Sequence, residues 1–112
     1  MANTDSKVFD DLFKTINERK GEKIEGSYTC YLFEQGIDKI LKKVGEEAAE
    51  TIIAAKNGEK DKIVLESCDL IYHLLVMLAE REVPLADVYN ELYIREQKQS
   101  NLKVFKKTDK NT

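Results

Sequence analysis

The 112-residue chain is poor in the residues that interrupt helices. It contains one proline, Pro84, five glycines and no tryptophan. Proline removes a backbone hydrogen-bond donor and glycine weakens regular structure, so a fold of many short strands and tight turns would need more of both. Their scarcity argues against such a fold and predicts an all-α protein.

Cysteine is also scarce, and no apolar run is long. Cys30 and Cys68 form no Cys-x-x-Cys pair and offer no disulfide framework. We expect Cys68 to behave as a small hydrophobic residue, because it lies in an apolar segment. The longest apolar stretch, residues 70–79, is too short to span a bilayer, and residues 1–20 lack the apolar core of a signal peptide. We therefore expect a cytoplasmic protein without a membrane partner.

Charge is unevenly distributed along the chain. The net charge is −3, yet residues 98–112 hold five lysines against one aspartate, which leaves −7 on residues 1–97. An acidic body argues against nucleic acid as a partner and suits a cation. We predict a single domain over residues 1–97, followed by a basic, solvated tail over residues 98–112.

Apolar residues recur at intervals of three and four, which is typical of amphipathic helices. Long helices are expected over residues 5–20, 37–57 and 61–81 and from Pro84 onward. Capping residues support these limits: Asp5 or Ser6 begins the first helix, Gly58 ends the second, and Ser27 and Gly36 bound a short additional helix. Because the links are short, we predict an antiparallel bundle of four main helices per chain.

Acidic residues are grouped on two consecutive long helices. Glu47 and Glu50 lie within one patch of the helix over 37–57. Glu66, Asp69 and His73 share one face of the next helix, which is otherwise apolar and is expected to be buried nearly all round. Facing carboxylates would repel one another unless a multivalent cation lay between them. Oxygen ligands without cysteine favour Mg²⁺ or Mn²⁺, and a network of acid–lysine ion pairs is the alternative.

A magnesium site of this kind suggests phosphoryl or pyrophosphoryl chemistry, because Mg²⁺ usually shares its coordination with substrate phosphates. Three lysines just upstream of the acids could neutralise phosphate oxygens, or could simply face water: Lys39, Lys42 and Lys43. Gly45 weakens its helix, so a close approach of a phosphate or of another helix would explain it, as would tight packing.

Two motifs resemble those of a known protein family. The sequence "EExxE" at 46–50, followed by "ExxD" at 66–69, resembles the signature of the MazG-like all-α nucleotide pyrophosphatases. Together with "SYT", "KKVGEEAAE" and "DLIYH", residues 7–95 resemble the phosphoribosyl-ATP pyrophosphatases of histidine biosynthesis. The resemblance implies Mg²⁺-dependent hydrolysis of phosphoribosyl-ATP to phosphoribosyl-AMP and pyrophosphate, with Mn²⁺ as a possible substitute. It also implies a homodimer with composite sites, in which dimerisation completes the bundle.

The resemblance further implies four metal ligands: Glu47, Glu50, Glu66 and Asp69. On chemical grounds, Glu46 or a ligand glutamate such as Glu47 would accept the proton of the attacking water, and Lys43 would stabilise phosphate charge. Substrate contacts are expected from Ser27, Tyr28, Thr29, Lys39, Lys42, Lys43, Tyr72 and His73. Ser27 could instead be only a helix cap, and Tyr72 and His73 could be a core tyrosine and a supporting histidine.

Two other functions remain open at this stage. A MazG-like house-cleaning enzyme would hydrolyse stray nucleoside triphosphates, and a non-enzymatic dimerisation module would use its acids only to bind lysines. The "SYT" and "YH" elements favour the histidine-pathway enzyme over the first. Four acids in an apolar setting argue against the second.

Overall fold

The computed structural model describes residues 7–99, which form five helices and no strand. The helices are α1 (Lys7–Arg19), α2 (Tyr28–Gln35), α3 (Ile37–Asn57), α4 (Lys60–Glu80) and α5 (Leu85–Gln99). The all-α prediction is confirmed. The proposed caps Asp5 and Ser6, and the tail beyond Gln99, lie outside the described residues. The domain limit after residue 97 stays a prediction, and α5 runs across it.

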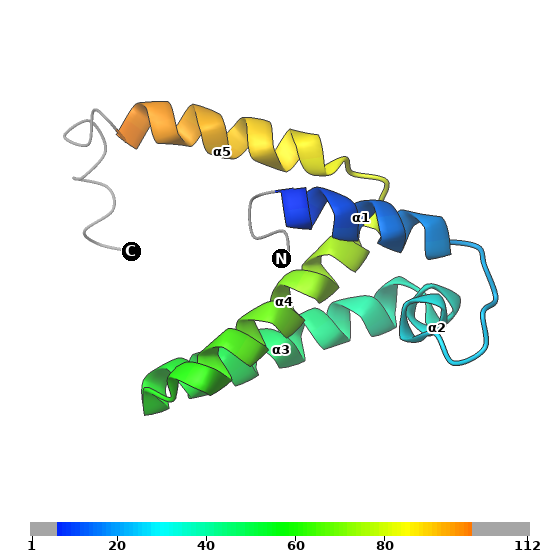
Figure 1. Ribbon diagram of the computed structural model, residues 1–112, viewed down its shortest axis with the longest axis horizontal. Coiled ribbons are helices and arrows are strands. Elements are labelled where there is room, and N and C mark those ends of the chain that lie inside the picture. The colour runs from blue at the N-terminus through cyan, green and yellow to red at the C-terminus, as the bar shows by residue number, and fades with distance from the viewer. Residues whose placement is uncertain (1–6, 100–112) are drawn as a thin grey trace.

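An antiparallel hairpin of α3 and α4 forms the centre of the molecule (Figure 1). Gly58 ends α3 with a φ of 70°, and its N–H donates to the carbonyls of Ala54 and Ala55. That left-handed conformation is open to glycine without strain, so the chain reverses here and α4 begins at Lys60. Residues at similar distances from this turn therefore face each other across the hairpin.

The short helix α2 begins and ends as its sequence predicts. The Ser27 hydroxyl accepts a hydrogen bond from the Cys30 N–H and so caps the first turn. Gly36, with a φ of 94°, ends α2 and leads directly into α3. The N-terminus of α2 is thereby held beside the first half of α3.

The hydrophobic core lies at the end of the hairpin remote from Gly58. Helix α1 packs against the second half of α4, and α2 packs against α3 (Figure 1). The α5 helix adds Leu85 to this core and then extends away from the hairpin (Figure 1). The buried residues of the core come from all five helices: Ile16, Leu32, Ile40, Leu75, Val76, Ala79 and Leu85.

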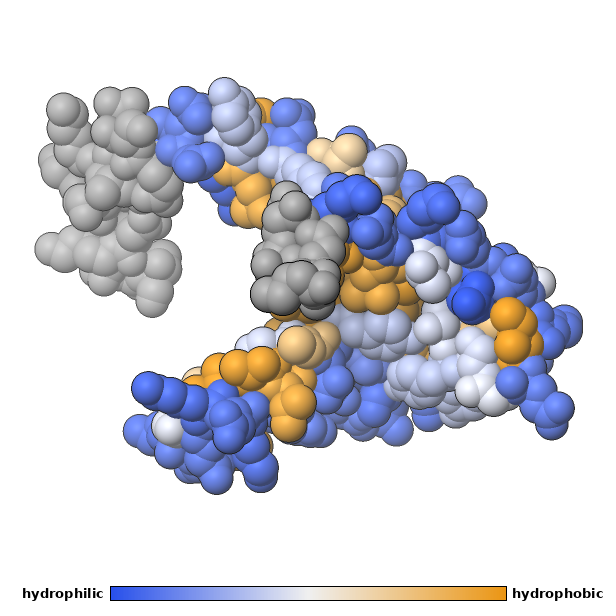
Figure 2. Space-filling view, viewed as in Figure 1, coloured by the Kyte–Doolittle hydropathy of each residue, from blue (hydrophilic) through white to orange (hydrophobic). Residues whose placement is uncertain are grey.

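The half of the hairpin near Gly58, residues 52–68, is here called the distal arm, and its apolar side chains are largely uncovered. Ile52, Ile53, Val64 and Leu65 are 68%, 59%, 60% and 63% exposed, and Figure 2 shows hydrophobic side chains gathered over this arm. Cys68 is also exposed. The sequence predicted that the helix over residues 61–81, now α4, is buried nearly all round, and that Cys68 is buried with it. For the single chain this prediction is wrong. The reason is that α1 reaches only the second half of α4 (Figure 1).

None of the helices within residues 7–99 combines the length and the apolar character that crossing a membrane requires.

Candidate metal and nucleotide site

The four predicted carboxylates meet between α3 and α4, and we call them the acid cluster: Glu47, Glu50, Glu66 and Asp69. Carboxylate oxygens of Glu47, Glu66 and Asp69 lie within 4.8 Å of one another. Glu50 joins them through its side-chain contact with Glu66. Glu47 is only 6% exposed, although it is charged. The hairpin thus brings acids that are far apart in the sequence into one place.

Within the acid cluster the carboxylates act on one another most clearly at the half-buried Glu66, whereas Glu50 and Asp69 are exposed. Burial raises the pKa of Glu66, and the hydrogen bond with Glu50 and the charges of Glu50, Asp69 and Glu47 raise it further. Lys43 forms an ion pair with this cluster, since its Nζ lies 3.4 Å from Oε2 of Glu47. Burial lowers the pKa of Lys43, but the charge of Tyr28 and the bonds to Glu47 and Glu46 outweigh it and raise the pKa.

Two oxygens of the acid cluster have no partner within the described part of the chain. Oε1 of Glu47 and Oε1 of Glu66 are both buried and accept no hydrogen bond. An uncompensated buried charge is unfavourable by several kcal/mol, and Lys43 contacts only the other oxygen of Glu47. Carboxylate oxygens are the ligands that Mg²⁺ and Mn²⁺ prefer. The donor set therefore fits a hard divalent cation.

Thr51, which was not among the predicted site residues, connects the two helices at the acid cluster. Its hydroxyl lies 2.7 Å from the carbonyl oxygen of Glu47 and 3.1 Å from that of Glu66. Both acceptors belong to residues of the acid cluster, so Thr51 sets the spacing between their backbones. A hydroxyl one turn after Glu47 was the only signal in the sequence.

A second group of predicted residues lies at the N-terminus of α2 and on α4. Tyr28 Oη is 2.9 Å from His73 Nε2, and the Thr29 hydroxyl is hydrogen-bonded to that of Tyr72. The Tyr28 ring stacks against Tyr31 and Tyr72, with centroids 6.1 Å apart in both pairs. Burial raises the pKa of Tyr28, Lys43 lowers it, and Glu47 raises it, so this hydroxyl is near the acid cluster.

The remaining predicted residues are more exposed or are already bonded. The Ser27 hydroxyl serves as the cap of α2. Glu46 is exposed and pairs with Lys42 at 4.0 Å and with Lys43 at 3.4 Å. Lys39 Nζ lies 5.9 Å from the centroid of the Tyr31 ring, a cation–π contact that the sequence analysis did not anticipate.

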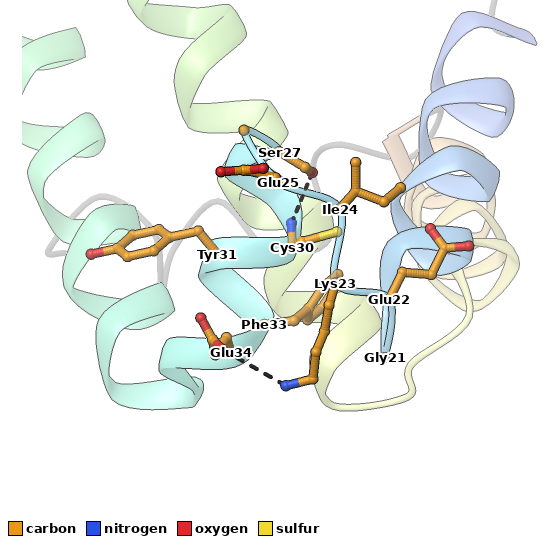
Figure 3. A pocket seen from close by; sticks show the side chains of 11 residues that line it. Gly21, Glu22, Lys23, Ile24, Glu25, Ser27, Cys30, Tyr31, Phe33 and Glu34 are labelled. Atoms are coloured by element: carbon orange, nitrogen blue, oxygen red, sulfur yellow. Dashed lines mark hydrogen bonds and ion pairs between the residues drawn. The ribbon is translucent and has the colours of Figure 1, made fainter.

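A pocket of about 390 Å³ lies on the far side of the α2 N-terminus, along the loop that joins α1 to α2. Figure 3 shows Glu22, Glu25 and Glu34 around it, with Tyr31 pointing toward α3. Lys23 pairs with Glu34 at 3.9 Å. The pocket shares Ser27 and Tyr31 with the residues around the candidate site, but its acidic lining does not suit a phosphate.

The fold and site together define a class: an all-α protein whose antiparallel helices hold a cluster of carboxylates fit for a divalent cation. The family described as phosphoribosyl-ATP pyrophosphohydrolase matches residues 9–96. The chain belongs to this family.

Curated relatives agree with this assignment. The chain is 52% identical over 101 residues to a phosphoribosyl-ATP pyrophosphatase of Clostridium botulinum, covering 90% of this chain and 92% of that protein. It is 56% identical over 93 residues to a protein of the same name from Listeria monocytogenes, covering 83% and 89%. It is 58% identical over 91 residues to a histidine biosynthesis bifunctional protein of Caldanaerobacter subterraneus, covering 81% of this chain and 44% of that protein.

Proposed function

We propose that this protein hydrolyses phosphoribosyl-ATP to phosphoribosyl-AMP and pyrophosphate, the second step of histidine biosynthesis, with Mg²⁺ as cofactor. Family membership supports the reaction. The observation that supports the cofactor is the pair of buried, unpartnered oxygens on Glu47 and Glu66. Mn²⁺ is the expected substitute, because it prefers the same oxygen ligands. A cytoplasmic location is part of the proposal.

The acid cluster would hold the ion through Glu47, Glu50, Glu66 and Asp69. When bound, the ion supplies polarisation of phosphoryl oxygens and neutralisation of the pyrophosphate leaving group. Lys43, which already lies beside Glu46 and Glu47, would donate to a phosphate oxygen. Glu46 is exposed and is paired with Lys42 and Lys43, and it or a ligand glutamate such as Glu47 would accept the proton of the attacking water.

The rest of the substrate would bind between α2 and the first turns of α3. The aromatic group of Tyr28, Tyr72 and His73 offers flat apolar surface for a purine and hydroxyls for a ribose. The first backbone N–H groups of α2, at Tyr28 and Thr29, could hold a phosphate beside the cap residue Ser27. Lys39 and Lys42 lie on the same side of α3 and would add positive charge.

The same proposal includes a homodimer. The apolar side chains of the distal arm have no cover within the described chain, and a second copy would bury them. The acid cluster adjoins this arm: a cavity of about 190 Å³ is lined by Glu50, Glu66 and Ile53. A partner seated on the arm would therefore close the metal site on one side.

Pyrophosphate release from phosphoribosyl-ATP, ATP and dATP, with Mg²⁺ and with chelator, tests this function. The metals alone cannot discriminate among triphosphates, so contacts to the added ribose phosphate must do so. One lost charge-assisted contact corresponds to roughly 1.5–3 kcal/mol, and we expect kcat/KM for phosphoribosyl-ATP to exceed that for ATP by at least about 100-fold. Comparable rates on all three would instead indicate the house-cleaning activity.

Variants of the acid cluster provide the matched controls. Asp69→Asn and Glu50→Gln should each lower activity on every substrate by at least about 100-fold while keeping the helical circular dichroism signal. Glu18→Gln removes an equivalent charge from an exposed ion pair with Lys14 on α1 and should leave activity unchanged. Full activity in both cluster variants would show that the metal site is elsewhere. Failure of the wild-type protein to release pyrophosphate from any of the three substrates would instead leave the dimerisation module as the function.

A further inference from the structure

We propose that His73 is a positioning residue that fixes the direction of its hydrogen bond with Tyr28, so that Tyr28 presents an acceptor to the ligand beside the acid cluster. The inference rests on the proposed function for the identity of that ligand. The direction of the hydrogen bond does not depend on the proposed function, because for a neutral imidazole it follows from contacts within the chain.

The first step is the position of the proton on the imidazole. His73 Nδ1 lies 2.7 Å from the main-chain carbonyl oxygen of Asp69. A carbonyl oxygen can only accept, so Nδ1 carries a hydrogen. In the neutral ring Nε2 then has none and must accept from Tyr28 Oη at 2.9 Å. The ring cannot easily flip, because it is 5% exposed and packs edge-on against Tyr28 and Tyr72.

The second step concerns what is left on the Tyr28 oxygen. A phenol has one O–H hydrogen, and Tyr28 donates it to His73 Nε2 in this hydrogen bond. Only the lone pairs of the oxygen remain for an external partner. An external partner can reach Tyr28, since this residue is 44% exposed. The partner must therefore be a hydrogen-bond donor, which excludes an ionised phosphate oxygen.

The third step is a division of labour with Lys43. Its ammonium contacts Glu46 and Glu47, both at 3.4 Å, and has one further N–H to donate. Phosphate oxygens would bind to this donor, whereas Tyr28 would accept from a hydroxyl. That hydroxyl has two possible sources: a ribose of the nucleotide, or a water molecule coordinated to the cation of the acid cluster.

Nuclear magnetic resonance can test the direction of the bond directly, because His73 is the only histidine in the chain. With ¹⁵N-labelled full-length protein at about pH 8, we expect protonated Nδ1 and unprotonated Nε2, because Nδ1 donates to the Asp69 carbonyl and Nε2 accepts from Tyr28. In Tyr28→Phe the Nε2 resonance should move further downfield, since it loses its donor. Protonated Nε2 in the wild-type protein would overturn the inference.

Variants at His73 separate positioning from packing. The side-chain oxygen of His73→Gln can accept from Tyr28, whereas His73→Leu cannot accept at all. We expect His73→Leu and Tyr28→Phe to weaken ligand binding, of Mn²⁺ or of phosphoribosyl-ATP, by the same factor of up to about 10-fold. We expect His73→Gln to retain most of the wild-type affinity. Equal losses in His73→Gln and His73→Leu, with unchanged circular dichroism, would contradict the inference.

The form of the defect identifies the donor. If it is a coordinated water, Tyr28→Phe and His73→Leu weaken Mn²⁺ binding measured by calorimetry without nucleotide. If it is a ribose hydroxyl, Mn²⁺ binding is unchanged and KM for phosphoribosyl-ATP rises while kcat is kept. A Tyr28→Phe variant that alters neither would refute the inference. Failure of the wild-type protein to release pyrophosphate would instead refute the proposed function. The ¹⁵N resonances of the His73 ring would still decide the direction of the hydrogen bond.

Discussion

Thr51 ties together the two helices that carry the acid cluster. Its single hydroxyl hydrogen is shared between the carbonyl oxygens of Glu47 on α3, at 2.7 Å, and of Glu66 on α4, at 3.1 Å, so Thr51 acts on the backbone positions of two proposed ligands. Groups that orient metal ligands commonly alter affinity by 10- to 100-fold when they are removed. Removing the Thr51 hydroxyl therefore tests whether the spacing of the proposed ligands affects metal affinity.

We expect Thr51→Val to weaken Mn²⁺ binding by about 3- to 10-fold, since valine keeps the shape of threonine but loses the hydroxyl. Thr51→Ser keeps the hydroxyl and should bind within about 2-fold of the wild-type protein. Calorimetric titration with Mn²⁺ measures both. If serine and valine behaved alike, the side-chain volume and not the hydrogen bond would set the spacing.

The raised pKa of Glu66 predicts a pH dependence. Burial, the hydrogen bond with Glu50 and neighbouring charges raise that pKa above its ordinary value of 4.5. Between 4.5 and the raised value the folded chain binds more protons than the unfolded chain, so the free energy of unfolding falls as pH rises through this window. Above this window the contribution of Glu66 to the free energy of unfolding no longer changes with pH.

In chelator, we expect the Tm of the wild-type protein to fall relative to that of Glu66→Gln as pH is raised from about 4.5. Saturating Mg²⁺ should stabilise the wild-type protein increasingly over the same window, because protons compete with the ion for the carboxylate. Thermal denaturation across this range provides the comparison. A Tm difference that did not change with pH would mean that Glu66 is not perturbed by its neighbours.

At the scale of the helical elements, Gly45 and Gly58 illustrate opposite uses of glycine in α3. Gly58 has a left-handed φ, whereas Gly45 lies inside the helix, and a Cβ at either position would meet no atom within 4 Å. Packing among residues 7–99 therefore does not explain Gly45. A phosphate or a second subunit beside Lys43 and Glu46 would.

Alanine substitutions should shift stability in opposite directions. Gly58→Ala should destabilise by about 1–2 kcal/mol, because L-residues are strained in the left-handed region. Gly45→Ala should stabilise by about 0.5–1 kcal/mol through its better helix propensity, and should lower activity. Urea denaturation and pyrophosphate release measure the two effects. Unchanged activity in Gly45→Ala would show that neither a phosphate nor a partner subunit approaches this position.

The elements were predictable from the sequence to the extent that local chemistry sets them. Ser27 and Gly36 determine where α2 begins and ends, and Gly58 determines where α3 ends. The short turn at Gly58 determines that the two acidic motifs face each other. The Thr51–Glu66 contact and the bond between His73 and Tyr28 were not predictable, because they depend on side-chain directions across helices. The exposure of Cys68 was missed because burial depends on which neighbours reach a helix, and periodicity does not report that.

At the scale of the whole molecule, two apolar surfaces lack cover within the described residues. One is the distal arm, with Ile52, Ile53, Val64 and Leu65, and the other lies on α5, where Leu92 and Tyr93 are exposed. Figure 1 shows α5 extending away from the hairpin that carries the distal arm. Surfaces of this kind on a soluble protein commonly mark an interface with another chain.

We predict a homodimer whose helical interface buries well over about 1,000 Å², since a stable association needs an area of that order. Light scattering at micromolar concentration should give about twice the chain mass of 12.9 kDa. Leu65→Asp places a charge on the distal arm and should yield monomers with a lower Tm and weaker Mn²⁺ binding, because the arm adjoins Glu50 and Glu66. Thr15→Asp adds the same charge on α1 and should remain dimeric. A wild-type monomer at these concentrations would refute the prediction, and a dimeric Leu65→Asp variant would move the interface from the distal arm to α5.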